Sequence, residues 1–141
     1  MHGSISAWCD GLNVLPPLLL DVLTFSGETD LPETFRDSNI DLIICINMIH
    51  ISPWECTEAL FRIAKTNLRV GGRICTYGPY KVDGTMVESN IKFDDSLRER
   101  CAQWGIRDVE AVQQVAEASG FTLKSTHEMP ANNMCLFFEK R

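Results

Sequence analysis

The seven residues Ile40–Ile46 constrain the fold most, because they read IDLIICI and are apolar at every position but one. A strand with one solvated face alternates apolar and polar residues, whereas a central strand covered by helices on both faces is apolar throughout. A run of this length is more typical of a buried strand than of a helix. We therefore expect an α/β fold built around this strand. The 141 residues leave room for one domain and one core.

The segment after this strand carries the signals of a helix start. Ser52 and Glu55 have the spacing of a capping box, and Pro53 would occupy the first helical position. The sequence thus predicts a helix from here to about Leu68, with a break at the glycine pair of residues 71–72.

Further strands and helices alternate along the rest of the chain. In order, we expect a strand at 18–22, a strand at 73–77 stopped by Gly78, a helix capped by Asp94 or Asp95 and ending near 102, a helix from Asp108 to Gly120, and a hairpin of 121–128 with 134–139. One further helix end at 4–9 and one helical turn at 31–35 are weaker predictions. This alternation favours a mostly parallel sheet with right-handed crossovers. Ligands bind such sheets at the carboxyl ends of the strands, here Asp21, residues 47–50 and residues 77–80.

Composition excludes several classes of protein. The net charge of −6 and pI near 5.0 leave no basic surface for nucleic acid or for an anionic membrane. The longest apolar run, residues 14–23, is too short to span a bilayer, and no Lys or Arg precedes Arg36 to form a targeting segment. The six cysteines form no Cys-x-x-Cys pair and no metal-ligand spacing. We expect reduced, mostly buried thiols and a cytoplasmic location, with the nucleus as an alternative.

Three segments of this sequence resemble one known family. They are DLIICINMIHISPWECTEALFR, GGRICTYGPYKVDG and MPANNMCLFF. They are similar to the methyltransferase-like protein twenty-six family, and the resemblance covers about residues 11–141. It implies the class I S-adenosylmethionine-dependent methyltransferase fold, a Rossmann-like sheet of order 3-2-1-4-5-7-6 in which strand 7 alone is antiparallel.

The resemblance also implies that part of this fold is missing. Residues 18–22 would be strand 3, Ile40–Ile46 strand 4, residues 73–77 strand 5, and the hairpin strands 6 and 7. Strands 1 and 2 would precede residue 11, and no Gly-x-Gly occurs to form the glycine-rich loop after strand 1. We therefore expect one partial domain, N-terminally truncated, in which residues 1–13 are the remnant of a helix and turn. A shortened isoform and a late-start gene model are both open.

The cofactor contacts follow from the same resemblance. It implies that Asp21 and Val22 bind near the adenine of S-adenosylmethionine, since a carboxylate accepts hydrogen bonds from an amine. It places Ile46, Asn47 and Met48 beside the methionine part. The alternatives are that Asp21 caps a loop and that Asn47 satisfies loop backbone.

The substrate side has one catalytic candidate. His50 is the one histidine near the strand ends, and it could act as a general base for a hydroxyl or amine. A hydrogen-bonded structural histidine is the alternative. The candidates for substrate binding are Trp54, Tyr77, Tyr80, Asn90 and Asn132.

The resemblance implies methyl transfer from S-adenosylmethionine to a small-molecule or protein substrate, and we expect the shortened chain to be inactive alone. Methyl transfer is an in-line displacement that depends mainly on holding two reactants close and aligned. A non-catalytic regulatory isoform that pairs with a partner, or with the full-length protein, through an exposed sheet edge is the alternative. An unstable product without function is a third possibility.

Overall fold

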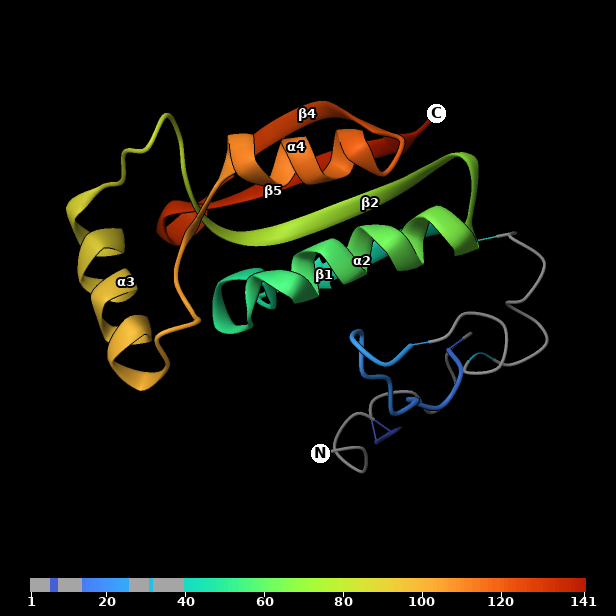
Figure 1. Cartoon of the computed structure of the whole chain (residues 1–141), viewed down its shortest axis with the longest axis horizontal. Coiled ribbons are helices and arrows are strands. Elements are labelled where there is room, and N and C mark those ends of the chain that lie inside the picture. The colour runs from blue at the N-terminus through green and yellow to red at the C-terminus, as the bar shows by residue number, and fades with distance from the viewer. Residues whose placement is uncertain (1–5, 8–13, 26–30, 32–39) are drawn as a thin grey trace.

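The computed structural model describes residues 6–7, 14–25, 31 and 40–141. Its central unit is a β-α-β crossover, coloured cyan to green in Figure 1. The strand β1 has the predicted bounds, Ile40–Ile46, and pairs in parallel with β2 (Leu68–Lys81). The helix α2 (Trp54–Asn67) connects them.

A C-terminal hairpin completes the sheet. The strands β4 (Phe121–Met129) and β5 (Asn133–Lys140) are antiparallel to each other, and β5 lies antiparallel against β2. The sheet order is β1-β2-β5-β4, with the two-residue β3 (Arg107–Asp108) paired to the end of β2. This order matches strands 4-5-7-6 of the predicted fold, including the antiparallel strand 7, so this part of the predicted Rossmann-like sheet is confirmed.

The expectation of a mostly parallel sheet is wrong for the described strands. Two of the four pairings, β1 with β2 and β2 with β3, are parallel, and the long pairings of β5 are antiparallel. The reason is the short connection Pro130–Asn132 between β4 and β5. A connection this short can join antiparallel strands, whereas parallel neighbours need a crossover of a dozen or more residues.

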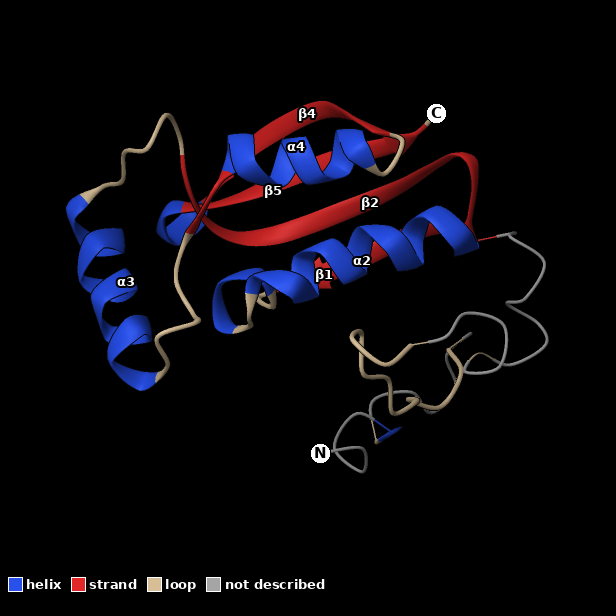
Figure 2. Cartoon of the chain, viewed as in Figure 1, coloured by secondary structure: helices blue, strands red, loops and turns tan. Residues whose placement is uncertain are grey.

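Helices α2 and α4 (Val109–Ala118) lie on the same face of the sheet, as Figure 2 shows. The core between them and the sheet contains three fully buried phenylalanines. The ring of Phe61 on α2 makes edge-to-face contacts with Phe121 and Phe138, at centroid distances of 5.7 and 5.1 Å. The predicted inward positions Val109, Val112 and Ala116 of α4 are buried in this core.

The prediction that β1 is covered on both faces is wrong for the described residues. Cys45 and Ile43 pack toward the core, but Leu42, Ile44 and Ile46 are 46%, 59% and 62% exposed. Both helices that pack on the described sheet lie on its other face. An apolar strand sequence indicates that both faces are suited to burial. It does not indicate which elements cover each face.

Residues 18–22 do not form the predicted strand. Residues 14–21 are irregular and a turn follows at 22–24, with Leu19 89% exposed. The Asp21 carboxylate accepts the backbone N–H of Leu23 at 2.9 Å, which closes the turn. A strand is stable only with a neighbour to pair with, and nothing in the sequence of one apolar run supplies that neighbour.

The start of α2 also differs from the prediction. Pro53 is the N-cap residue and not the first helical residue, and no side chain caps the helix. The Ser52 hydroxyl instead donates to the carbonyl oxygen of Met48 at 2.9 Å. A serine hydroxyl has several backbone partners within reach, so capping-box spacing alone does not decide which one it takes.

Two element bounds after α2 were wrong. The strand β2 runs through the glycine pair and past Gly78 to Lys81, because neighbours on both sides hold it. The helix α3 (Glu88–Arg100) begins well before Asp94, so neither Asp94 nor Asp95 caps it. The Asp108 position is the N-cap of α4 as predicted, although its side chain makes no capping hydrogen bond.

Some predictions fall on residues outside the description. The helix end at 4–9 is described only at residues 6–7, and the helical turn at 31–35 only at Leu31. Among the described cysteines, all are free; Cys45, Cys56 and Cys75 are buried, and Cys101 and Cys135 are partly buried. None of the helices in the described ranges has the length and apolar character needed to cross a membrane.

The phenylalanine cluster gives a test of this core. Replacing Phe61 by Ala is expected to lower the free energy of unfolding by about 3–5 kcal/mol, since it removes a fully buried ring and leaves a cavity. Urea unfolding followed by circular dichroism measures the loss. The control Val70→Ala, at a residue 71% exposed, should change it by less than about 0.5 kcal/mol. Equal effects of the two variants would contradict the packing described.

Candidate functional site

The carboxyl ends of β1 and β2 lie side by side and begin the site. The chain leaves β1 at Asn47, which has a left-handed backbone with φ of 53°. Its N–H donates to the carbonyl oxygen of Tyr77 on β2 at 2.9 Å, and a short 3-10 turn, Ile49–Ile51, follows. This turn directs the side chain of His50 back toward β2.

The His50 side chain is buried against Gly78. The residue is 5% exposed, and its ring meets Phe93 of α3 edge-on at a centroid distance of 5.8 Å. A Cβ atom at position 78 would lie 3.1 Å from Nδ1 of His50, so a glycine on β2 is what allows the ring to sit here. Burial lowers the pKa of His50 below its ordinary 6.5. The imidazole is therefore neutral at pH 7 and able to accept a proton.

The buried carboxylate of Asp94, paired with the partly exposed Arg98, fixes the loop behind His50. Asp94 of α3 accepts hydrogen bonds from Arg98 at 2.9 Å and from the backbone N–H of Ile106. Burial by itself raises the pKa of Asp94, but these two hydrogen bonds outweigh it and hold the pKa below the ordinary value. In the same loop, the N–H of Gly105 donates to the His50 carbonyl oxygen at 3.0 Å. The loop between α3 and β3 thus holds the histidine backbone in place.

An asparagine latch, Asn90 and Asn132, joins α3 to the hairpin turn. Asn90 is 7% exposed, and its Nδ2 donates to the carbonyl oxygen of Asn132 at 3.2 Å. The side chain of Asn132 donates in return to the Ser89 hydroxyl at 3.0 Å. Ala131 and Asn132 both have positive φ, 58° and 57°, a conformation that asparagine adopts readily but that is unfavourable for alanine. The latch helps to hold this strained turn.

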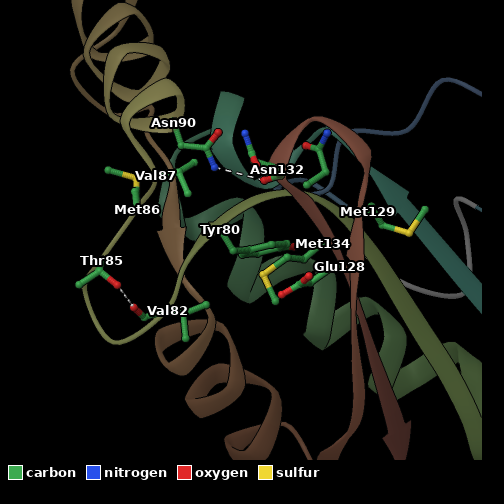
Figure 3. A pocket seen from close by; sticks show the side chains of 11 residues that line it. Tyr80, Val82, Thr85, Met86, Val87, Asn90, Glu128, Met129, Asn132 and Met134 are labelled. Atoms are coloured by element: carbon green, nitrogen blue, oxygen red, sulfur yellow. Dashed lines mark hydrogen bonds between the residues drawn. The ribbon is translucent and has the colours of Figure 1, made fainter.

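Two adjoining hollows flank the latch and share Asn90, Asn132 and Asn133. The histidine hollow, of about 550 Å³, is lined by these three together with Asn47, His50, Pro79, Ser89, Phe93 and Ala131. The methionine hollow, of about 450 Å³, lies between the β2–α3 connection and the hairpin and is drawn in Figure 3. It is lined by the shared asparagines and by Tyr80, Val82, Thr85, Met86, Val87, Glu128, Met129 and Met134.

Four of the predicted site residues meet in the histidine hollow: His50, Asn47, Asn90 and Asn132. They come from distant parts of the chain, and together they place one imidazole and three amides around one space. Tyr80 lines the neighbouring methionine hollow. Its hydroxyl donates to Thr76 at 2.7 Å inside the core, and burial raises its pKa, so its ring edge and not its hydroxyl is available to a ligand.

The other predicted residues lie elsewhere. Asp21 and Val22 are in the irregular segment before β1, and Ile46 is on the open face of the sheet. Met48 packs against the core. Neither hollow is lined by any of these four or by Tyr77, which is partly buried on β2. Their predicted roles in binding therefore stay predictions.

Trp54 lies in a third hollow of about 230 Å³, near Lys81 and Arg98. The guanidinium of Arg107 lies 5.7 Å from the centroid of its ring, a cation–π contact. Arg107 also donates to the carbonyl oxygens of Ser52 and Gln103. The tryptophan thus anchors a loop. It does not line the histidine hollow, and its predicted contact with substrate stays a prediction.

Sequence reasoning missed several residues of the site, among them Phe93 and Glu128, whereas Pro79 lies in the strand end at 77–80 that was expected to line it. One signal was available for Phe93. Asn90, Phe93 and Leu97 have the i, i+3, i+7 spacing of one helix face. This spacing would have predicted an earlier start for α3, with Phe93 on the same face as Asn90. Nothing local marks Glu128, because its place depends on the pairing of β4 with β5 and of β5 with β2.

S-adenosylmethionine needs polar partners for its amino acid, ribose and adenine groups. The described residues offer Asn47 at the end of β1, but Asp21, predicted to bind the adenine amine, already accepts a backbone N–H and lines neither hollow. Of the predicted cofactor residues, the two hollows therefore contain Asn47 and neither Asp21 nor Val22. Within the same residues, no group of three or more His, Cys, Asp or Glu side chains could hold a metal.

Solved structures with the same fold include methyltransferases and also a pericyclic reaction enzyme. LaPhzM superposes with a TM-score of 0.73 at 11% identity, covering 99% of this chain and 39% of that one. The mitomycin 7-O-methyltransferase MmcR gives 0.72 at 14% identity, covering 98% and 37%. CalO1, a methyltransferase in calicheamicin biosynthesis, in its SAH-bound form, gives 0.63 at 11% identity, covering 78% and 33%.

These likenesses define the fold class as a methyltransferase-like α/β sheet, part of a Rossmann-like fold, with a C-terminal antiparallel hairpin. The chain spans less than two fifths of the length of each of these three structures. By its sequence, the chain belongs to the family described as protein of unknown function (DUF938), whose model matches residues 1–140.

The lowered pKa of His50 predicts how stability depends on pH. Because the folded protein keeps the imidazole neutral while the unfolded chain takes up a proton near pH 6.5, the free energy of unfolding should fall as pH drops from about 7 toward the folded pKa. Thermal or urea unfolding between pH 7.5 and 5 measures this slope. The variant His50→Gln should flatten it, whereas the exposed-site control His127→Gln should not. A slope that survives in His50→Gln would contradict the assignment.

The latch has its own test. The variant Asn90→Ala leaves the carbonyl of Asn132 without its partner and should lower the free energy of unfolding by about 1–2 kcal/mol. Hydrogen exchange of the amides at 131–133 should quicken. The control Lys92→Ala, exposed on the same helix, should leave this exchange unchanged. Unchanged exchange in Asn90→Ala would show that the turn does not depend on the latch.

Proposed function

We propose that this chain supplies the acceptor side of a site for methyl transfer from S-adenosylmethionine, and that it is a member of the methyltransferase-like protein twenty-six family. The observation that carries the proposal is the neutral, buried His50 on the wall of the histidine hollow, at the carboxyl ends of two parallel strands. Ligands of open α/β sheets bind at this edge. The methyltransferase-like fold and the sequence resemblance both support this choice of reaction.

The chemistry available to the described residues is proton removal and orientation. A hydroxyl or amine of the acceptor within hydrogen-bond reach of His50 would lose its proton to the imidazole as it becomes a nucleophile. The amides of Asn47 and of the latch can each donate and accept hydrogen bonds, which would fix the direction of the attacking atom. The acceptor itself, a small molecule or a protein side chain, is not specified by these groups.

The cofactor would depend on residues other than those described, so we propose that the chain by itself has little or no methyltransferase activity. Calorimetric titration of the purified chain with S-adenosylmethionine tests this. We expect no saturable heat up to about 1 mM, which corresponds to a binding free energy weaker than about −4 kcal/mol. Binding with a dissociation constant near 10 μM would contradict this part of the proposal.

The role of His50 has a separate test. In any preparation of the chain that transfers methyl groups, His50→Gln should lower kcat by about 100-fold or more and change the KM for S-adenosylmethionine little. Raising the pH should restore part of the rate, since the acceptor then ionises without a base. The His127→Gln control should keep full activity. Full activity in His50→Gln would exclude the histidine as the base.

A binding or regulatory module is the second candidate, favoured by the open side of β1. Leu42, Ile44 and Ile46 are exposed, and within the described ranges β1 pairs with β2 alone. An unpaired strand edge beside an exposed apolar face is a template for another strand. Pairing there would add strands on the side that the predicted order 3-2-1-4-5-7-6 fills.

A further inference from the structure

The methionine hollow adjoins the proposed site and has no role in it so far. Its walls are mixed: Met86, Met129 and Met134, together with valines of the β2–α3 connection, form the apolar part, and the shared asparagines and Glu128 form the polar part of a space of about 450 Å³. Methionine side chains are flexible and polarisable, so they adapt to ligands of irregular shape. The hollow adjoins the histidine hollow, and the two share the lining residues Asn90, Asn132 and Asn133.

One charged residue, the solvent-exposed Glu128, lines this hollow. Figure 3 shows Glu128 beside Met134, with Tyr80 above both in this view. Glu128 and Met134 are partners in the pairing of β4 with β5. The carboxylate of Glu128 makes no hydrogen bond or ion pair with any residue of the described part of the chain. No Lys or Arg lines the hollow.

The two lysines nearest to Glu128 in the sequence have other partners. Lys124, on the same strand, pairs with Glu139 at 3.5 Å. Lys140 donates to the backbone carbonyl oxygens of Lys65 and Leu68. The whole chain has a net charge of −6, so the surrounding field adds to the local negative charge.

We propose that the methionine hollow binds the cationic end of a small organic amine, whose other end carries the hydroxyl or second amine that reaches His50. Glu128 would pair with the ammonium group, and the methionines would cover the apolar body. The asparagines shared by the two hollows would lie over the middle of the molecule. This inference rests on the proposed function for the identity of the acceptor, and on the hollow and its lone carboxylate for the charge preference.

Three probes of nearly equal shape test the inference. Tyramine carries an ammonium group and a phenol; tyrosol replaces the ammonium by a hydroxyl; 3-(4-hydroxyphenyl)propanoate replaces it by a carboxylate. Calorimetry or ligand-observed NMR should rank them in this order, with tyramine binding about fivefold tighter than tyrosol, the size of effect typical of a solvent-accessible ion pair. The preference should shrink at high salt.

The variants separate this inference from the proposed function. Glu128→Gln should remove the difference between tyramine and tyrosol, while Glu58→Gln, an exposed carboxylate on α2 away from both hollows, should keep it. Absence of binding by all three probes up to about 10 mM, or a tyramine preference retained in Glu128→Gln, would overturn the cation site.

The imidazole NMR resonances of His50 test whether a bound probe reaches the proposed acceptor site. If they shift with every probe but no probe is preferred, the cation site is wrong and the acceptor site stands. If the Glu128-dependent preference is present and His50 does not respond, the cation site stands and the proposed acceptor geometry is wrong.

Discussion

The parallel pairing of β1 with β2 is the constraint on which the rest of the structure depends. It requires a crossover, which α2 makes, and it packs Phe61 of that helix against the hairpin. It also brings the ends of both strands to one edge, where the Asn47 N–H bonds to Tyr77 and the His50 ring lies on Gly78. The same pairing therefore determines both the core and the position of the candidate base.

The site is assembled from two further segments that are far from β1 in sequence. Helix α3 contributes Asn90 and Phe93, and the hairpin turn contributes Asn132. The latch between α3 and the turn is also the boundary between the two hollows. A ligand that spans both hollows would contact all three segments at once, so binding and the order of the turn are coupled in this geometry.

The elements with strong local sequence signals were predicted correctly. The predictions failed for elements whose formation depends on a neighbouring strand or helix. The bounds of β1, the inward face of α4 and the terminal hairpin were predicted from apolar runs, helical spacing and turn residues. The strand at 18–22 was not formed, although it is as apolar as β1, because no partner strand pairs with it in the described chain. Of the predicted site, His50, Asn47, Asn90 and Asn132 are brought together, while Trp54 lies in another hollow.

The sequence by itself determined an α/β core, the chemical types available at the strand ends, and a net charge of −6. Only the tertiary structure decided which side chains face one another. The His50 pKa, the partners of Asn90 and the isolation of the Glu128 carboxylate all arise from contacts between distant segments. The physical reason is that local patterns report backbone preference and burial, whereas a site depends on burial and hydrogen bonding that sheet pairing creates.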